Sequence, residues 1–440
     1  MTATTASTPA PATARARARL TPGIGIWYLA LWVFGLLGLA AWIYELKDGL
    51  ATTGMRDVVS WGMYIFTFAF FIGLSAGGLI MASSAEVFGI TELRPLSKLG
   101  VLSAAGCVLV AAIMILPDLG RPERIFNLLF HPNWSSPLIW DVLIILVYLI
   151  FSVVDLFVLH AQERRQTKNV QVLRVLAYIG LPLAVLLHSV TAWIFGLQIA
   201  RPWWNTSLMA PLFVVSAILS GTALVTLLAL AAHRWGGLAL SEKTRDWLRG
   251  FIVVSLIIDL FFVGADYITI LWGNQPARSA LELVLPNGSY SWTFWFEWIV
   301  GGVVPALFLL VPRMRKIPGS LGIAAALVLV GVYAFRVELV VIGFINPVTQ
   351  FPPGQAIGTS STGSSPFQFV GQYTPTWVEY SIILGLIAVF LAVVTVGYRR
   401  MISPRASASS ASGAPEPAAD KAPAADPEPV ELAMSAESGS

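Results

Sequence analysis

Ten long apolar runs dominate this chain and restrict what it can fold into. Crossing a bilayer takes about 20 apolar residues, and in lipid each such segment must satisfy its own backbone hydrogen bonds, which favours helices. Only 12% of the residues are charged, against about 25% in soluble domains. We therefore predict an all-α polytopic membrane protein with ten transmembrane helices. The runs lie at residues 25–45, 58–84, 99–116, 138–160, 174–199, 209–233, 250–273, 291–311, 319–344 and 377–398.

The two ends of the chain differ from this apolar body. Residues 1–20 are rich in Ala, Thr and Pro, and residues 401–440 are rich in Ala, Ser, Pro and Glu. Segments with so little to bury stay disordered. We predict a disordered N-terminal arm, a membrane domain at 21–400 and a disordered C-terminal tail.

Lysine and arginine are distributed unevenly between the two sides of the predicted spans. Ten spans put both ends of the chain on one side, and 20 of the 27 basic residues fall there. Because Lys and Arg concentrate in cytoplasmic loops, we predict a multi-pass protein of the bacterial cytoplasmic (inner) membrane with both termini cytoplasmic. The segment 117–137 then faces outward. One further basic residue lies within a span and six lie on the outer side: Arg336, and then Lys47, Arg56, Arg121, Arg124, Arg201 and Arg278.

An internal repeat relates the first and second halves of the membrane domain. Residues 61–67 open the second span much as residues 210–216 open the sixth. The stretch 132–141, which ends in Trp-Asp, has a counterpart at 286–297, which ends in Phe-Glu. We predict two four-helix bundles in the same orientation, formed by spans 2–5 and 6–9, with spans 1 and 10 flanking them.

The loop at residues 117–141 gathers ionisable and aromatic groups in a chain where charge is scarce. It begins Pro-Asp-Leu-Gly-Arg-Pro-Glu-Arg and ends His-Pro-Asn-Trp-Ser-Ser-Pro-Leu-Ile-Trp-Asp. Asp141 follows Trp140 directly beneath this loop, and Glu297 holds the equivalent place in the repeat. This pattern favours chemistry at the membrane surface.

Ionisable residues within the spans are costly and are by default candidates for function. Asp259 and Asp266 are seven residues apart and share a helix face, so they predict a polar seam. Arg336 and Glu338 are two apart and cannot pair with each other; each needs a partner on another helix. The alternative for these groups is a structural ion pair between helices. The candidates are Asp141, Asp155, His188, Asp259, Asp266, Glu297, Arg336, Glu338 and Glu379.

Cysteine and histidine give little support for a bound metal or haem. Cys107 is the single cysteine, so the chain has no cysteine-ligated cluster. A bis-histidine haem needs two histidines at one depth, and only His160 and His233 match, at the membrane surface among arginines. We expect neither haem nor bound metal.

The outer groups suit a quinone, whose carbonyls accept hydrogen bonds and whose reduction consumes two protons. Arg121, His131 and Asp141 supply donors and a proton-exchanging group. The aromatic residues that supply flat walls are Trp61, Tyr64, Trp134 and Trp140. The same residues could instead build an aromatic belt with an anchored loop.

These residues carry a resemblance to a known family. Trp61-Gly-Met-Tyr64, followed by Gly73-Leu-Ser-Ala-Gly-Gly78, resembles the first core span of the NrfD/PsrC family of polysulfide reductase-type membrane subunits. Its outer loop is similar to Asp118-Leu-Gly-Arg-Pro122 with Ser136-Pro137 and Trp140-Asp141. The stretch 373–379 resembles its C-terminal element. The resemblance covers about residues 25–400, and ten spans match longer members such as those of alternative complex III.

The resemblance implies a haem-free, quinone-reactive membrane anchor of a respiratory oxidoreductase. Such anchors exchange electrons between menaquinone or ubiquinone and an iron–sulfur (ferredoxin-like) subunit outside the membrane, often beside a molybdopterin-containing catalytic subunit. Carried over by position, the quinone-site residues are Arg121, His131, Trp140 and Asp141, with Trp61, Tyr64 and His188 lining the pocket.

Other readings of the same residues stay open. The polar groups Asp259, Asp266, Glu297, Arg336 and Glu338 suggest a proton path coupled to electron transfer. A secondary transporter with a midplane site around Arg336 and Glu338 is the alternative function. A purely structural anchor without quinone is the third.

Overall fold

The computed structural model describes residues 22–403 apart from 57, 167–168, 274 and 346–370. The predicted disordered arm, and all but the start of the predicted tail, lie outside the described residues. Within them the chain is helical, and ten helices are long and apolar enough to cross a membrane. The prediction of an all-α polytopic membrane protein is confirmed.

The ten long helices follow the ten apolar runs in order. One of them is interrupted by a π-helical stretch and consists of α10, η5 and α11. The bounds are α1 Pro22–Asp48, α2 Met63–Val87, α3 Arg94–Asp118, α5 Pro137–Arg164, α6 Val170–Gly196, α7 Met209–Ala231, α8 Glu242–Trp272, α10 Ser291–Phe294, η5 Trp295–Val303, α11 Val304–Leu310, α13 Ser320–Ile345 and α14 Trp377–Gly397.

Short helices occupy several connections that the apolar pattern had left as loops. One of them, α4, lies within the loop expected at 117–141, and another, α9, precedes the eighth span. The short elements are η1 Leu50–Thr52, η2 Thr91–Leu93, η3 Pro122–Arg124, α4 Ile125–Phe130, η4 Ala232–Gly236, α9 Gln275–Val284, α12 Pro312–Arg315 and η6 Tyr398–Ile402.

Helix α8 begins well before the apolar run that predicted it. The run starts at residue 250, whereas the helix starts at Glu242. The Ser241 side chain accepts a hydrogen bond from the Thr244 amide at 3.1 Å and so caps the helix. The first two turns are rich in polar residues, so a search for runs of apolar residues does not include them.

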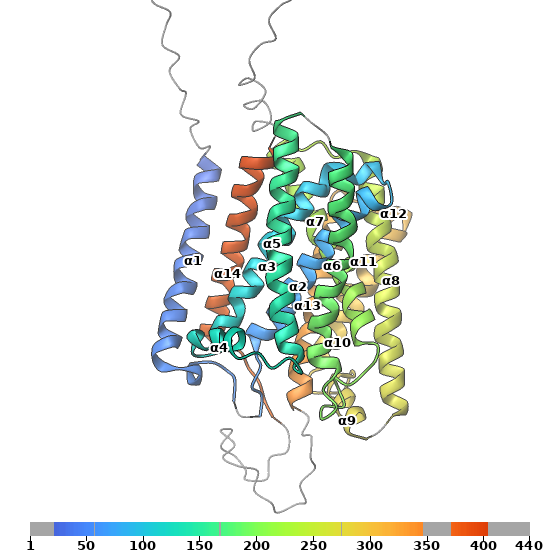
Figure 1. The fold of residues 1–440 in the computed structure, drawn as a ribbon. Helices are drawn as coiled ribbons and strands as arrows, with labels where there is room; N and C mark the ends of the chain where they lie inside the picture. Colours follow the sequence, from blue (N-terminus) through green and yellow to red (C-terminus); the bar gives the residue numbers. More distant parts are fainter. Residues whose placement is uncertain (1–21, 57, 167–168, 274, 346–370, 404–440) are drawn as a thin grey trace, which may run out of the picture.

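The long helices form two closed rings of four, which confirms the predicted bundles. In the first, α2, α3, α5 and α6 contact one another in turn; in the second, α7, α8, the η5–α11 segment and α13 do the same. Helices α1 and α14 pair with each other beside α3 and α2 (Figure 1).

Helices α2 and α7 join the two bundles at very close range. A side chain at Gly77 would place its Cβ 1.8 Å from the Ala217 carbonyl oxygen, and one at Gly221 would meet the Gly77 backbone at 2.4 Å. Small residues four apart, such as Ala217 and Gly221, allow this approach between membrane helices, which gain stability through backbone packing.

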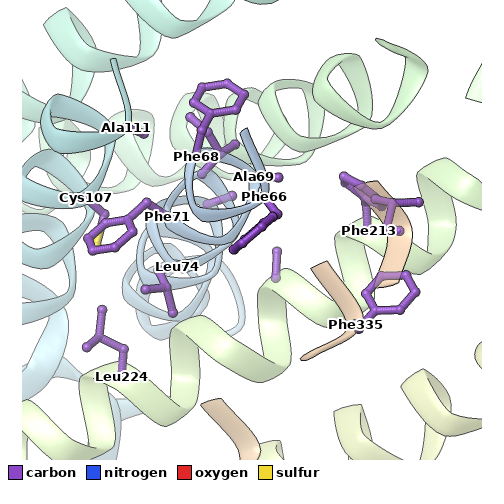
Figure 2. Packing of buried hydrophobic residues seen from close by; sticks show 14 of the residues in the cluster. Phe66, Phe68, Ala69, Phe71, Leu74, Cys107, Ala111, Phe213, Leu224 and Phe335 are labelled. Atoms are coloured by element: carbon purple, nitrogen blue, oxygen red, sulfur yellow. The ribbon is translucent and has the colours of Figure 1, made fainter. Parts of the chain in front are cut away.

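The core is centred on α2, where 89% of the residues in the most apolar 18-residue stretch are buried. Figure 2 shows its side chains between Cys107 and Ala111 of α3 on one side and Phe213 and Phe335 on the other. By contrast, only 17% of the residues in the corresponding stretch of α1 are buried. This difference in burial is consistent with α2 at the contact between the bundles and α1 at the periphery.

The helix ends define two faces of the molecule. The start of α1 and the end of α14 lie at one end, which we call the terminal face (top of Figure 1). The opposite end, with α4 and α9, is called the loop face. That the loop face is extracytoplasmic stays a prediction from the basic residues.

Candidate functional site

The loop-face residues predicted to contact quinone lie largely on the surface. Arg121, His131 and Trp140 are exposed. The Trp140 indole Nε1 donates a hydrogen bond to the Trp134 carbonyl at 2.9 Å. This bond ties the start of α5 to the preceding turn, so these side chains form a rim and not an enclosed pocket.

Asp141 differs from its neighbours because it points inward. Pro137 stands at the first position of α5, where its fixed φ favours helix initiation, and Asp141 follows one turn later. Its side chain is buried, and its Oδ1 accepts a hydrogen bond from the Thr191 hydroxyl of α6 at 2.6 Å. The structure therefore places a carboxyl group inside the first bundle, close to the loop face.

His188 lies one helical turn from Thr191 on α6 and is completely buried. Its ring packs 5.1 Å from that of Phe213, and its Nε2 lies 3.3 Å from Nη2 of Arg336. Because a guanidinium group can only donate, Nε2 must be the acceptor in this contact. A neutral His188 then carries its proton on Nδ1, which has no partner among the described residues.

Arg336 links the two bundles at the level of His188. Its Nη2 donates to the Ser216 hydroxyl of α7 at 2.5 Å, and its guanidinium carbon lies 3.9 Å from the centre of the Phe213 ring. As predicted, it pairs with other helices and not with Glu338. Nε and Nη1 of Arg336 have no hydrogen-bond partner among the described residues, and its charge acts on Asp259 and Glu297.

The carboxylates of the second bundle gather beside Arg336. Glu338 accepts a hydrogen bond from the Tyr267 hydroxyl at 2.6 Å, and Glu297 lies 3.4 Å from the same hydroxyl. Asp259 and Glu297 line a cavity of about 10 Å³, which has room for about one water molecule at most. Glu297 stands in the π-helical η5, a conformation that is frequent at functional sites.

Asp266 shares a helix with Asp259 and lies near Glu338. Its Oδ1 accepts a hydrogen bond from the Thr206 hydroxyl at 2.9 Å, in the connection before α7. Of the five residues predicted for the proton path, Asp259 and Glu297 line the small cavity, whereas Asp266 lies closer to the loop face.

Trp61 belongs to an aromatic cluster between the bundles at the loop face. Its ring stacks on Trp204, with 5.9 Å between centroids, and meets Phe344 edge-on at 5.6 Å. The Arg201 guanidinium covers Phe344 at 4.6 Å and donates to the Gly343 carbonyl at 2.8 Å. Burial lowers the pKa of Arg201.

Tyr64 points away from Trp61, toward α1. Its hydroxyl donates to Glu45, which is buried near the end of α1. The two predicted quinone-lining residues therefore face different groups. Sequence reasoning did not single out Glu45; a lone carboxyl at the end of an apolar run looks like an ordinary interfacial residue.

Glu379 holds together the segments around Tyr64. Its Oε2 accepts hydrogen bonds from the Gly54 amide at 2.7 Å and the Thr376 amide at 2.9 Å. Its Oε1 accepts from the Tyr373 hydroxyl at 2.5 Å, and that hydroxyl in turn accepts from the Met63 amide at 2.6 Å. Burial, and then the nearby Glu379 carboxylate, raise the pKa of Tyr373, so the phenol stays protonated and donates.

The arrangement offers a sequence of polar groups from the loop face to the middle of the molecule. It starts at Asp141, continues through Thr191 and His188 to Arg336, and ends at the cavity beside Asp259. Across the described part of the chain, no group of three or more His, Cys, Asp or Glu side chains could hold a metal ion.

Comparisons with known proteins identify the group to which this fold belongs. The family described as Polysulphide reductase, NrfD matches residues 51–347. The chain belongs to the NrfD family. A putative dimethyl sulfoxide reductase membrane subunit of Halobacterium salinarum is 31% identical, covering 88% of this chain and 93% of its own length.

Two other NrfD relatives have names that mention a quinone. The Hdr-like menaquinol oxidoreductase integral membrane subunit of Archaeoglobus fulgidus is 26% identical, covering 82% of this chain and 89% of its own. The menaquinone reductase integral membrane subunit of Nitratidesulfovibrio vulgaris is 24% identical, covering 85% of this chain and 90% of its own length.

The match to the NrfD family begins after α1 and ends before α14. The pair formed by α1 and α14 therefore lies outside the matched region.

Proposed function

We propose that this chain is the quinone-binding membrane subunit of a respiratory oxidoreductase. It exchanges electrons between the quinone pool and an iron–sulfur subunit docked on the loop face, with a molybdopterin or similar catalytic subunit completing the complex. Membership of the NrfD family supports this, as do relatives named as menaquinol oxidoreductase and menaquinone reductase subunits. The observation that carries the proposal is the buried carboxyl of Asp141 beneath the exposed loop.

The chemistry needs a group that exchanges protons next to the quinone head. Converting a quinone to a quinol takes up two electrons and two protons, and the reverse reaction releases them; the electrons pass to or from the partner's cluster. Asp141 takes or gives a proton, and Thr191 orients it through the 2.6 Å hydrogen bond. Arg121 and His131, exposed at the rim, donate to the head-group carbonyls, while Trp61 and Trp140 flank it.

Protons reach the interior along the polar groups that lead from Asp141. His188 accepts or releases a proton at its buried ring. Asp259 and Glu297 do so around the small cavity, and Glu338 does so beside Tyr267. Arg336 keeps its proton and acts as a fixed positive charge that stabilises the ionised forms of Asp259 and Glu297. Asp266 belongs to the loop-face end of the same path.

Asp259→Asn tests the interior part of the path. The amide cannot carry a proton, so we expect the ratio of protons moved to electrons transferred to fall by half or more, while electron transfer to the quinone persists. The ratio is measured with the complex in sealed vesicles containing a pH-sensitive dye. Asp246→Asn is the control because Asp246 is an exposed partner of Arg249 and Arg315. An unchanged ratio in Asp259→Asn would remove it from the path.

Purification of the native complex tests the function as a whole. We expect an iron–sulfur subunit and a larger catalytic subunit to copurify with the chain, and the complex to oxidise quinol or reduce quinone. Companions are identified by mass spectrometry and turnover by absorbance of the quinone. A chain that purifies alone and moves a solute into vesicles would instead support the transporter around Arg336 and Glu338. A complex that turns over without binding quinone would support the structural anchor.

A further inference from the structure

The Tyr267 hydroxyl of α8 lies between two carboxyl groups that belong to other helices of the second bundle. Its oxygen is 2.6 Å from Oε1 of Glu338 on α13 and 3.4 Å from Oε2 of Glu297 in η5. All three side chains are buried. Three helices of the bundle thus meet at one ionisable hydroxyl in the interior of the molecule.

The number of protons decides the direction of these two contacts. A phenol carries one proton, so Tyr267 cannot donate to both carboxyl groups at once. When it donates to Glu338, the contact with Glu297 is a hydrogen bond only if Glu297 is protonated and donates to the phenol oxygen. When it donates to Glu297, the same reasoning requires a protonated Glu338. The two states are the same chain of hydrogen bonds with its direction reversed.

The surroundings of the two carboxyl groups favour a shared proton. Oε1 of Glu297 and Oε2 of Glu338 have no hydrogen-bond partner among the described residues. Within the same part of the chain, no salt bridge neutralises either group. Burying an unpaired charge is costly, and a proton held between the carboxyl groups through Tyr267 reduces that cost.

The two carboxyl groups lead in different directions. Glu297 lines the small cavity together with Asp259. Glu338 lies near Asp266, which accepts a hydrogen bond from Thr206 at 2.9 Å in the connection before α7. The Tyr267 hydroxyl therefore lies between the cavity and the residues that approach the loop face through the second bundle.

We infer that Tyr267 relays protons between Glu297 and Glu338. The O–H bond of the Glu297 carboxyl breaks as its proton moves to the phenol oxygen, and the phenol's own proton forms a new O–H bond on Glu338. No electron moves, and the phenol is neutral before and after the step. Rotation of the hydroxyl about its C–O bond then restores the first direction. The inference rests on the proposed function, to which it adds a residue that carries protons between two of its carboxyl groups.

Tyr267→Phe keeps the ring and removes the hydroxyl. With the native complex in sealed vesicles, we expect the ratio of protons moved to electrons transferred to fall by half or more, while electron transfer to the quinone is retained. Tyr333→Phe makes the same change at a tyrosine of α13 whose hydroxyl lies 3.1 Å from that of Thr67, and it should keep the ratio. An unchanged ratio in Tyr267→Phe would overturn the relay.

Glu338→Gln separates a relay from a purely structural hydrogen bond. The glutamine carbonyl can still accept from the Tyr267 hydroxyl, but the amide cannot take up the proton. A relay therefore predicts the same fall in the ratio as in Tyr267→Phe. A normal ratio in Glu338→Gln would show that the hydroxyl only holds residue 338 in place and would overturn the inference. This variant also decides the question if Tyr267→Phe does not assemble.

Infrared difference spectra recorded during turnover report on the proton transfer itself. We expect a carboxylic acid C=O signal from Glu338, assigned by its loss in Glu338→Gln. The signal should also be absent in Tyr267→Phe, where the carboxyl group is still present. If it persists there, Glu338 receives its proton by another route and the relay is wrong.

Failure of the proposed function would give a different result. An unmodified complex that turns over quinone without moving protons would overturn both the proton path and the relay, and would leave quinone binding intact. A fall in the ratio in Asp259→Asn but not in Tyr267→Phe would overturn the relay alone.

Discussion

Replacing Asp141 with asparagine is expected to lower quinone-coupled turnover by a factor of about 100 to 10,000, the usual contribution of a positioned acid or base. Asparagine keeps the shape of the side chain and can still accept the hydrogen bond from Thr191, which is 2.6 Å long in the structure. It cannot exchange a proton with the quinone. Turnover is measured with the purified complex and a soluble quinol, and copurification of the partner subunits reports on assembly.

Asp48→Asn is the matched control for this experiment. Asp48 ends α1 at the same face but is exposed, so the same chemical change there should leave both turnover and assembly unaltered. Normal turnover in Asp141→Asn would exclude Asp141 from the reaction. Loss of the partner subunits in that variant would show that Asp141 acts in assembly, and the proton-exchange role would then have to be abandoned.

Among glycine-to-alanine changes in the described long helices, Gly77→Ala is expected to give the largest loss of stability. The new Cβ would lie 1.8 Å from the Ala217 carbonyl oxygen, a distance that only movement of the α7 backbone can relieve. Overpacking of this kind costs about 1–3 kcal/mol and occasionally more, and here it acts on the contact between the two bundles. We expect a lower yield of monodisperse protein and a lower temperature of aggregation in detergent.

Gly250→Ala makes the same change where nothing lies within 4 Å of the new Cβ. Because alanine favours helix over glycine by up to about 1 kcal/mol, this control should be neutral or slightly stabilising. If both variants aggregate at the temperature of the unmodified protein, α2 and α7 do not pack as closely as the structure indicates.

The fold follows from the sequence because lipid leaves so few solutions for an apolar run. Each run of about 20 residues has to become a helix, and the weak repeat between 61–67 and 210–216 was enough to predict the two bundles. The sequence could not predict features that depend on polar or local signals. The first turns of α8 and the short helix α9 lie in mixed polar segments, where apolar length gives no information.

The candidate site could be predicted only in part, because the sequence does not show in which direction each side chain points. The side chain of Asp141 is buried, whereas Arg121 and His131 of the same loop are exposed. Spacing alone cannot tell which side chains turn inward. Partners on distant helices were also missed. Ser216 and Tyr267 are inconspicuous in the sequence, yet they bind Arg336 and Glu338, since tertiary packing brings them there.

The hydrogen bonds of Glu379 bear on how a partner would dock. This one carboxylate fixes the chain after α1, the residues before α14 and, through Tyr373, the first residue of α2. Ordering loops upon association opposes binding, because each immobilised side chain costs about 0.5–1.5 kcal/mol. This part of the loop face is already ordered in the folded chain, so binding a partner does not have to order it. A partner protein that docks there meets a preformed surface and can bind tightly through a modest area.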